Sequence, residues 1–519
     1  MEKKYVIGTD IGTSACKTLI VDRDHNIIAS KTIEYPLYTP KPGWVEQDAF
    51  DWWKATTETI SGVLKESGID PKYVAGVGLS GQMHGMVPLD NNAAILRRAI
   101  LWNDQRTEKQ CRDITGLAGG EDKLIGLTNN LMLPGYTGGK ILWMRENEPE
   151  LYKKLRYILN PKDYIRYRLT GEISTEVSDA SGTGLFDVKN RRWSEELINI
   201  LKVPLEYFPK CYESTDITGY ITKEAAEQTG LAEGTPVVGG GGDAVIQTTG
   251  MGLVKEGTLG LILGTGGISA MGLNCFRKNT GGRLQVFCNN LPDTWHVMGV
   301  TLAGGGSYQW YKNYFCDAEE ATAKQEQKDV YEILNEEAAL SAPGANGLIF
   351  LPYLNGERCP YADVTARGVF FGLSLMHRKR DMTRSILEGV QFSLKQISDL
   401  IKKLGNGIDI SEIIISGGGS RSALWRQITA DIFQCPVKVL KGSAEGGAYG
   451  AALISGIGCG LWENIDEALG SLTVESENVP DRNNKKIYEE MYKIYTSLYP
   501  ALTAAYNNLY NLVKENNRD

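Results

Sequence analysis

Short apolar runs alternate with amphipathic stretches along most of the chain. Apolar runs at residues 5–7 and 18–21 flank a turn rich in glycine and small polar residues, and the run at 259–263 leads into a second such turn. In each case the pattern predicts a hairpin of two short strands joined by a tight turn. The hairpins lie in different halves of the chain, which indicates a short and degenerate internal repeat.

The runs between and beyond these hairpins predict further strands and helices. The expected strands are 74–79, 235–238, 347–351 and 412–415, and the expected helices are 153–169, 382–404 and 487–513. Strands that alternate with helices are typical of an α/β protein. Tyrosines at three- and four-residue spacing along the last helix predict a packing stripe, and Pro500 is expected to kink or divide that helix.

The length of the chain indicates two domains. Its 519 residues are more than one compact core of ordinary size accommodates. We place the domains at residues 1–247 and 248–519 and expect a cleft between them. With 42% hydrophobic and 23% charged residues, the composition is that of a globular protein with a sizeable core.

Charge and cysteine content exclude several classes of protein. The net charge of −8 is spread along the chain without a basic block, so nucleic acid is not expected as a partner. No apolar segment reaches the ~20 residues of a membrane span, and the N-terminal apolar stretch is too short for a signal peptide. Nine scattered cysteines without a C-x-x-C pair argue against disulfides and zinc and indicate a reducing cytoplasm. A homodimer is compatible with this composition.

The first glycine turn has the residue types that bind phosphate. Gly12 lets the backbone approach phosphate oxygens, and Thr13 and Ser14 add hydroxyl donors. Lys17 adds positive charge, and Asp10 can hold Mg²⁺ through water. Phosphoryl transfer needs such a phosphate turn, a metal ion and an aligned hydroxyl. The alternative is a tight hairpin turn that binds nothing.

Three later stretches complete this pattern. The second turn, with Thr265 and Gly266, can close on the same phosphates, and the glycines at 416–422 lie between an expected strand and a helix start, which suits a nucleotide. Asp243 follows four glycines and is the candidate base for a hydroxyl. A plain turn or a helix cap also explains an acid in this position.

Polar side chains cluster at residues 82–84 and 102–104, with aromatic surface nearby. Gln82, His84 and Asp104 offer the paired polar groups that bind sugar hydroxyls. Taken by itself, a histidine such as His84 is more often a hydrogen-bonded structural residue.

Together these stretches resemble the FGGY family of carbohydrate kinases, and within it the xylulokinases, over nearly the whole chain. The similar stretches are GTDIGTSACK (8–17), LSGQMHG (79–85), LWNDQR (101–106), NNLMLPGYTGGKILW (129–143), NPKDYIRYRLTGE (160–172) and SDASGTGLFDV (178–188). A spaced pattern of glycine, aromatic and acidic residues between 368 and 388 is similar to the family's long C-terminal pattern. This pattern is the strongest single feature.

The resemblance implies a fold, a reaction and a set of site residues. The fold would be a duplicated actin-like (ribonuclease H-like) ATPase core, with sugar bound mainly by the first domain and ATP mainly by the second, and with Mg²⁺ near Asp10. The reaction would move the γ-phosphate of ATP to a small ketose such as D-xylulose, with Asp243 as the base. The residues implied at the phosphates and nucleotide are Thr13, Ser14, Lys17, Thr265, Gly266, Gly305, Gln309, Gly418 and Ser422. Those implied at the sugar are Met83, His84 and Asp104, beside Gln82.

Three departures from the xylulokinase pattern concern the substrate. Ala244 follows the candidate base where Asn is usual, which removes one expected polar contact to the sugar. Cys359 and Tyr361 replace the usual Thr and His, and the turn at 264–267 lacks the usual serine. Another pentulose, a hexulose or a polyol therefore stays open as the substrate. A non-catalytic actin-like binding module is the alternative of another class, but it would lack either the base or the sugar cluster.

Overall fold

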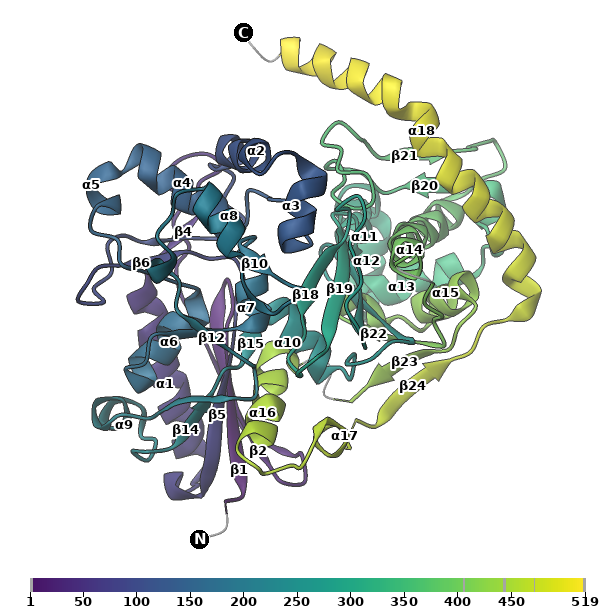
Figure 1. Cartoon of the computed structure of the whole chain (residues 1–519). Coiled ribbons are helices and arrows are strands. Elements are labelled where there is room, and N and C mark those ends of the chain that lie inside the picture. Colours follow the sequence, from purple (N-terminus) through teal and green to yellow (C-terminus); the bar gives the residue numbers. More distant parts are fainter. Residues whose placement is uncertain (1–2, 405–406, 442–444, 471, 517–519) are drawn as a thin grey trace. The chain divides into compact units, whose positions relative to one another are not determined.

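The structure is a computed structural model, shown in Figure 1, which describes residues 3–404, 407–441, 445–470 and 472–516. The chain forms two compact units. Unit 1 comprises residues 1–255, 272–296 and 445–472, and unit 2 comprises residues 256–271, 297–444 and 473–519. A single cut after residue 247 therefore does not separate them. The chain returns to unit 1 twice, because the returning segments pack there.

Unit 1 is built on a mixed sheet. Its strands lie in the order β13-β14-β5-β1-β2-β3, and β15 also pairs with β5. Their bounds are β1 (Tyr5–Ile11), β2 (Ala15–Asp22), β3 (Ile27–Glu34), β5 (Val74–Gly81), β13 (Ile217–Tyr220), β14 (Pro236–Val238) and β15 (Gly241–Gly242). β1 runs antiparallel to β2 and parallel to β5, so the first predicted hairpin is confirmed.

Unit 1 also contains further helices and short strands. The helices are α1 (Ala49–Ser67), α2 (Glu108–Leu117), α3 (Glu121–Thr128), α4 (Thr137–Asn147), α5 (Pro149–Tyr152), α6 (Pro161–Thr170), α7 (Val177–Ser181), α8 (Glu195–Ile200), α9 (Lys223–Thr229), α10 (Asp243–Gly250), α16 (Gly446–Gly458) and α17 (Ile465–Ala468). The short strands are β4 (Glu46–Gln47), β6 (Val87–Leu89), β7 (Ala99–Ile100), β8 (Tyr157–Leu159), β9 (Ser174–Glu176), β10 (Phe186–Asp187), β11 (Arg192–Trp193), β12 (Lys210–Tyr212) and β18 (Gln285–Cys288).

Helices α1 and α16 cover opposite faces of the sheet of unit 1. Ile7 of β1 belongs to the same buried core as Trp52 of α1, whereas Val6 belongs to a core with Ala448 of α16. Successive side chains of a strand point to opposite faces, so the two helices lie on opposite sides. This arrangement explains why the segment at 445–472, although distant in sequence, belongs to unit 1.

Glycines in the strands let α16 lie against the sheet (Figure 1). A Cβ atom at Gly8 of β1 would lie 1.9 Å from the carbonyl oxygen of Ala448, and one at Gly78 of β5 would lie 2.0 Å from that of Ala451. No side chain fits in these gaps. The strand glycines therefore set how near the start of α16 comes to the end of β1.

The strands of unit 2 repeat the order of unit 1. Read in the same direction as in unit 1, they lie in the order β24-β23-β22-β16-β17-β19. Their bounds are β16 (Thr258–Leu263), β17 (Gly267–Leu273), β19 (Trp295–Thr301), β22 (Glu412–Ser416), β23 (Val437–Leu440) and β24 (Val474–Asn478). β16 is antiparallel to β17 and parallel to β22, as β1 is to β2 and β5. The predicted repeat therefore extends to the whole sheet, and the duplicated α/β fold is confirmed.

The helices of unit 2 complete the fold. They are α11 (Gly305–Phe315), α12 (Asp317–Glu326), α13 (Val330–Ala339), α14 (Lys379–Lys402), α15 (Ala423–Phe433) and α18 (Lys485–Asn516), and a small sheet pairs β20 (Ile349–Leu351) with β21 (Val369–Phe371). Asp381 caps α14 by accepting the backbone N–H of Arg378 at 2.8 Å. The long C-terminal pattern at 368–388 thus includes structural contacts of this helix.

One predicted helix is wrong, and one of two alternatives for another helix is excluded. Residues 153–169 do not form one helix, since β8 pairs with β6 and α6 begins only at Pro161. The residue before a proline favours an extended backbone, and Asn160 has φ −82° and ψ 164°. In unit 2, α18 continues through Pro500, so the proline does not divide this helix, and the alternative of a kink stays a prediction.

The tyrosines of α18 form the packing stripe that the sequence predicts. Tyr488, Tyr495 and Tyr506 are buried, and the Tyr495 hydroxyl lies 3.0 Å from that of Tyr353. Across the part of the chain that the structure describes, no helix has both the length and the apolar character needed to cross a membrane.

Candidate active site

Three parallel strand ends bring the predicted acids of unit 1 to one edge of the sheet. Asp10 lies near the end of β1, and β5 ends just before residues 82–84. β15 pairs in parallel with the end of β5, with Gly241 opposite Ser80, so Asp243 follows at the same edge. Open α/β sheets bind ligands at this carboxyl edge. The fold therefore brings Asp10 and Asp243 close to residues 82–84, the first stretch predicted to bind the sugar.

Asp10 lies at the start of helix α16. Its Oδ1 accepts a hydrogen bond from Ser80 Oγ at 2.6 Å, and a Cβ at Gly447 would lie 2.9 Å from the same oxygen. Burial raises the pKa of Asp10, while Ser80 and Lys17 act in the opposite direction. Lys17 pairs with Glu445, 2.5 Å from Nζ to Oε2. The structure thus places the cation predicted for phosphate next to a carboxylate that the sequence analysis missed.

Asp243 is the first residue of α10. Its Oδ1 accepts the backbone N–H of Ala244 at 2.7 Å. Burial, together with the negative charge of Asp10, raises the pKa of Asp243 to about 7. A base works best when its pKa is near the operating pH, so this carboxylate suits proton transfer at neutral pH.

Thr13 and Gln82 belong to a cluster that holds the first turn in place. Gln82 donates to the carbonyl oxygen of Gly12 at 3.3 Å and accepts from Thr13 Oγ1 at 3.4 Å. Trp102 Nε1 also donates to Thr13 Oγ1, at 2.9 Å. Gln82 is fully buried and its amide is used by the turn, whereas Ser14 is exposed.

Met83 and His84 lie directly beyond the end of β5. A Cβ at Gly242 would lie 2.5 Å from Met83 Cγ, so Met83 packs on the residue before Asp243. His84 Nδ1 lies 2.6 Å from the carbonyl oxygen of Gly182, and its ring stacks on Tyr136 at 4.6 Å. A carbonyl oxygen only accepts, so Nδ1 carries the proton in this contact.

Asp104 is fully buried, and protein donors engage its carboxylate. Arg106 donates through Nε to Oδ1 at 2.9 Å and through Nη2 to Oδ2 at 2.7 Å, and the backbone N–H of Val45 donates at 2.6 Å. The Arg106 guanidinium lies 3.8 Å from the ring centre of Trp44. Both oxygens are therefore used to hold the loop that contains Asp104.

Unit 2 contains a cavity of about 640 Å³ lined by all three of its glycine-rich stretches. The predicted residues that line it are Thr265, Gly305, Gln309, Gly418 and Ser422. Gly266 is not a lining residue. Cavities of this size accommodate ligands as large as a nucleotide. The structure thus brings together residues that are more than a hundred positions apart.

Only glycine fits where two of these stretches meet. A Cβ at Gly304 would lie 2.2 Å from the backbone oxygen of Gly266, and one at Gly305 would lie 2.8 Å from that of Gly264. The N–H of Gly305 donates to the oxygen of Gly264 at 2.8 Å. Gly266 therefore shapes the cavity from behind instead of lining it.

The aromatic wall of this cavity was not predicted from the sequence. Tyr308, Tyr331, Asn335 and Trp425 also line it. The Tyr308 hydroxyl donates to Asn335 Oδ1 at 3.2 Å, and its ring lies 5.1 Å from that of Tyr331 and 5.8 Å from that of Trp425. The only local signal is an aromatic residue close behind the glycines at 304–306. Such a wall suits the planar base of a nucleotide.

Asp10 and Asp243 are the acids of this site that can hold a divalent cation. Within the described ranges, no group of three or more His, Cys, Asp or Glu side chains is arranged to bind a metal. Mg²⁺ needs only one or two carboxylates when water and substrate phosphates supply the other ligands. Because the charge of Asp10 raises the pKa of Asp243, a cation between them would be stabilised. The two residues therefore fit Mg²⁺.

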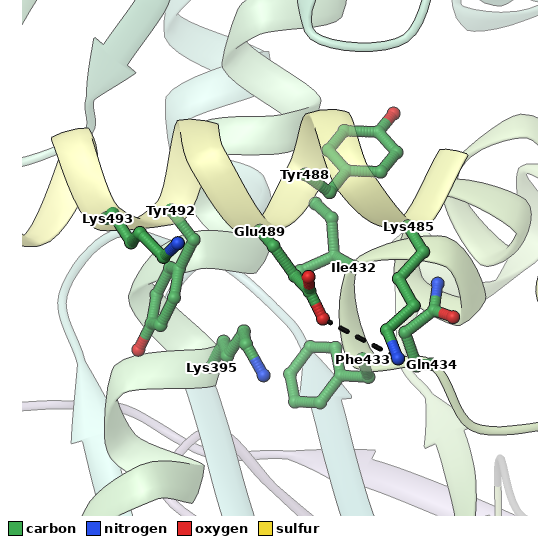
Figure 2. A pocket seen from close by; sticks show the side chains of 9 residues that line it. All are labelled: Lys395, Ile432, Phe433, Gln434, Lys485, Tyr488, Glu489, Tyr492 and Lys493. Atoms are coloured by element: carbon green, nitrogen blue, oxygen red, sulfur yellow. Dashed lines mark ion pairs between the residues drawn. The ribbon is translucent and has the colours of Figure 1, made fainter. Parts of the chain in front are cut away.

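A second cavity of unit 2, about 350 Å³, contains none of the predicted site residues. Figure 2 shows Lys485 and Glu489 paired beside it, with Nζ and Oε1 3.8 Å apart. Lys395 Nζ lies 5.5 Å from the ring centre of Phe433 and 5.2 Å from that of Tyr492. The lysines of this cavity are therefore already in contact with a carboxylate or with aromatic rings of the same unit. We assign this cavity no part in the reaction.

Comparisons with known proteins agree over both units. The model for the N-terminal domain of the FGGY family of carbohydrate kinases matches residues 5–250, and the model for its C-terminal domain matches residues 260–459. A xylulose kinase from Bacillus subtilis (strain 168) is 36% identical over 497 residues, which cover 96% of this chain and 97% of that protein. A gluconokinase from the same strain is 29% identical over 508 residues, which cover 97% of each.

A solved structure agrees with the fold. The crystal structure of ligand-bound xylulose kinase from Lactobacillus acidophilus is similar with a TM-score of 0.89 at 27% identity, covering 98% of this chain and 100% of that one. The likeness extends over nearly the entire chain. The predicted duplicated actin-like fold is therefore confirmed.

Proposed function

Because the chain belongs to the FGGY family of carbohydrate kinases, we propose that it phosphorylates D-xylulose with ATP to give D-xylulose 5-phosphate. The observation that carries this proposal is Asp243, a carboxylate of raised pKa at the sheet edge beside Asp10 and Met83. The residues that bind the sugar, and the catalytic base, lie chiefly in residues 1–247. The residues that bind the nucleotide lie chiefly in residues 248–519.

Asp243 acts as the base of the reaction. Its carboxylate accepts the proton of the terminal sugar hydroxyl while that oxygen attacks the γ-phosphorus in line. The bond between this phosphorus and the bridging oxygen breaks, and ADP leaves with the electron pair. Met83 gives the sugar an apolar surface next to the base, and His84 lies beside it as a second sugar-binding side chain.

The nucleotide binds in the cavity of unit 2. The aromatic wall holds the adenine base of the nucleotide, and the glycine turns present backbone N–H groups and hydroxyls to its phosphates. The residues that surround the nucleotide are Thr265, Gly305, Gln309, Gly418 and Ser422, while Gly266 contributes by packing behind this cavity. Thr13 and Ser14 meet phosphate from the first turn, and Lys17 adds positive charge beside them.

Asp10 has the metal-binding role. It would hold Mg²⁺ through water, with Asp243 as a nearby second acid. A bound Mg²⁺ offsets the negative charge that the phosphates bring to the site. Gln82 and Asp104 act indirectly, since Gln82 holds the phosphate turn and Asp104 holds the loop of Trp102.

The proposal predicts a pH dependence. Asp243 accepts a proton only as the carboxylate, so the fraction of active enzyme rises as the pH rises through the pKa of about 7. We expect kcat/KM to fall about tenfold per pH unit below that value and to level off above it. In Asp10→Asn, the loss of the neighbouring negative charge should lower the pKa of Asp243, so the fall in kcat/KM should begin at a lower pH. A profile that stays flat from acid to neutral pH would rule out Asp243 as the base.

A substrate panel tests the choice of sugar. ADP release should be compared for D-xylulose, a second ketopentose, a ketohexose, D-gluconate and glycerol. We expect D-xylulose to exceed each alternative at least about tenfold in kcat/KM, the effect of a group placed correctly or wrongly in the site. D-gluconate belongs in the panel because of the gluconokinase relative and because Ala244 lacks a polar side chain. A higher kcat/KM for gluconate would assign the protein to that substrate.

The same assay separates catalysis from binding. A non-catalytic module would bind nucleotide without releasing ADP in the presence of any sugar of the panel. Nucleotide affinity, measured by calorimetry, and ADP release together therefore decide between an enzyme and a sensor.

A further inference from the structure

Lys140 of α4 is a buried cation with an unusual set of partners. Its side chain is fully buried, and within the part of the chain that the structure describes it forms no ion pair. Lys162, also fully buried, instead lies 2.6 Å from the carboxylate of Asp163. A buried charge without a carboxylate partner is unfavourable. Lys140 therefore needs an explanation other than stability.

The ammonium group of Lys140 binds the backbone of His84, one of the residues proposed to bind the sugar. Nζ donates to the carbonyl oxygens of His84 and Gly135, each at 2.7 Å. Thr137 Oγ1 donates to the same His84 oxygen at 3.0 Å. Two side chains from the start of α4 thus hold one peptide group, directly beyond the end of β5.

His84 has a backbone that requires such support. Its φ is 70°, in the left-handed region that a residue with a side chain seldom adopts. Its ring is also held, by the carbonyl oxygen of Gly182 at 2.6 Å and by stacking on Tyr136. A Cβ at Gly182 would lie 2.8 Å from His84 Nδ1, so only glycine fits there. The family-like stretches at 129–143 and 178–188 thus meet at this one histidine.

We propose that Lys140 is a positioning residue for the sugar: by holding the backbone of His84, it fixes the place of the His84 side chain in the sugar site. This inference rests on the proposed function, in which His84 binds the ketose. Burial lowers the pKa of Lys140 to about 7, which agrees with a cation bound chiefly by neutral carbonyl oxygens, with Asp104 as the nearby opposite charge. Lys140 is fully buried and its ammonium group is bound by backbone oxygens, so its effect passes through His84.

The test replaces Lys140 by Met, which keeps the length of the side chain and removes its donors. We expect the dissociation constant for D-xylulose, measured by calorimetry, to rise about 5- to 30-fold, as for the loss of one well-placed hydrogen bond. The dissociation constant for ATP should stay unchanged, because its residues lie elsewhere. Arg145→Met is the matched control. Arg145 is a cation of the same helix that donates to the backbone oxygen of Leu201 at 2.8 Å, so its loss should leave sugar binding unchanged.

A double-mutant cycle shows whether Lys140 acts through His84. In the His84→Ala background the histidine side chain is absent, and Lys140→Met should then weaken sugar binding no further. An equal loss in both backgrounds, or unchanged sugar binding in Lys140→Met, overturns the proposal. If Lys140→Met does not fold, Thr137→Val removes the other donor to the same oxygen, and unchanged sugar binding in that variant overturns it equally.

A measurement without sugar separates this inference from the proposed function. The chain has four histidines, so their side-chain ¹⁵N resonances can be assigned by substitution. His84 should show the Nδ1–H tautomer in the parent protein, and its resonances should shift or broaden in Lys140→Met but not in Arg145→Met. If the parent protein binds no sugar of the panel, the proposed function fails, and the His84 resonances alone decide: a shift supports the positioning of His84, and no shift overturns it.

Discussion

Replacement of Asp243 by Asn is expected to lower kcat about 10²–10⁴-fold, the usual contribution of a positioned acid or base. The change keeps the shape of the side chain at the start of α10 but removes its ability to accept a proton. ATP affinity should change little, because the proposed nucleotide residues line a cavity of unit 2. Single-turnover rates and nucleotide titration measure the two effects separately.

Asp293→Asn provides the control for this experiment. Asp293 is an exposed acid of the same unit and lies on a loop, so kcat should stay at the parent value. Parent-like turnover in Asp243→Asn would remove the proposed base. An equal loss of kcat in both variants would show that the loss is not specific to Asp243.

Replacement of Gly304 by Ala is expected to weaken ATP binding about 5- to 100-fold. The added Cβ would lie 2.2 Å from the backbone oxygen of Gly266, so one of the two glycine stretches has to move. Overpacking of this kind costs about 1–3 kcal/mol, and 1.4 kcal/mol corresponds to a factor of ten in affinity. Calorimetric titration with ATP measures the change.

Gly126→Ala is the matched control for Gly304→Ala. Gly126 lies inside α3 of unit 1, and a Cβ there would meet no atom within 4 Å. Alanine favours a helix over glycine by about 1 kcal/mol, so this variant should be at least as stable as the parent and should bind ATP normally. Unchanged ATP affinity in Gly304→Ala would show that the contact between the two stretches does not shape the nucleotide site.

Much of the candidate site is readable from local sequence. The turns at Gly12 and Gly264 were recognisable because glycine and small polar residues after an apolar strand specify a tight turn whatever surrounds it. Asp243 was conspicuous for a similar reason, since four glycines precede it. The helix predicted at 153–169 failed because the apolar run at 157–159 pairs with a distant strand, which no local pattern reveals.

The roles of several polar residues depend on partners far away in the chain. Gln82 and Asp104 carry side chains that suit a sugar, yet in the fold Gln82 holds Gly12 and Asp104 is engaged by Arg106 and Val45. Lys17 pairs with Glu445, more than four hundred positions later. A polar side chain can satisfy its hydrogen bonds in many ways, and the sequence does not say which donor arrives.

The sequence by itself determined the α/β class, the two hairpins, the glycine turns and the acid at 243. Each of these depends on neighbouring residues, whose backbone preferences and periodicity act over a few positions. Only the tertiary structure decided that α16 returns to unit 1, that an aromatic wall faces the glycine turns, and that Lys140 holds His84. These features arise from close packing and hydrogen bonds between distant segments, where the fit of two surfaces decides which residues meet.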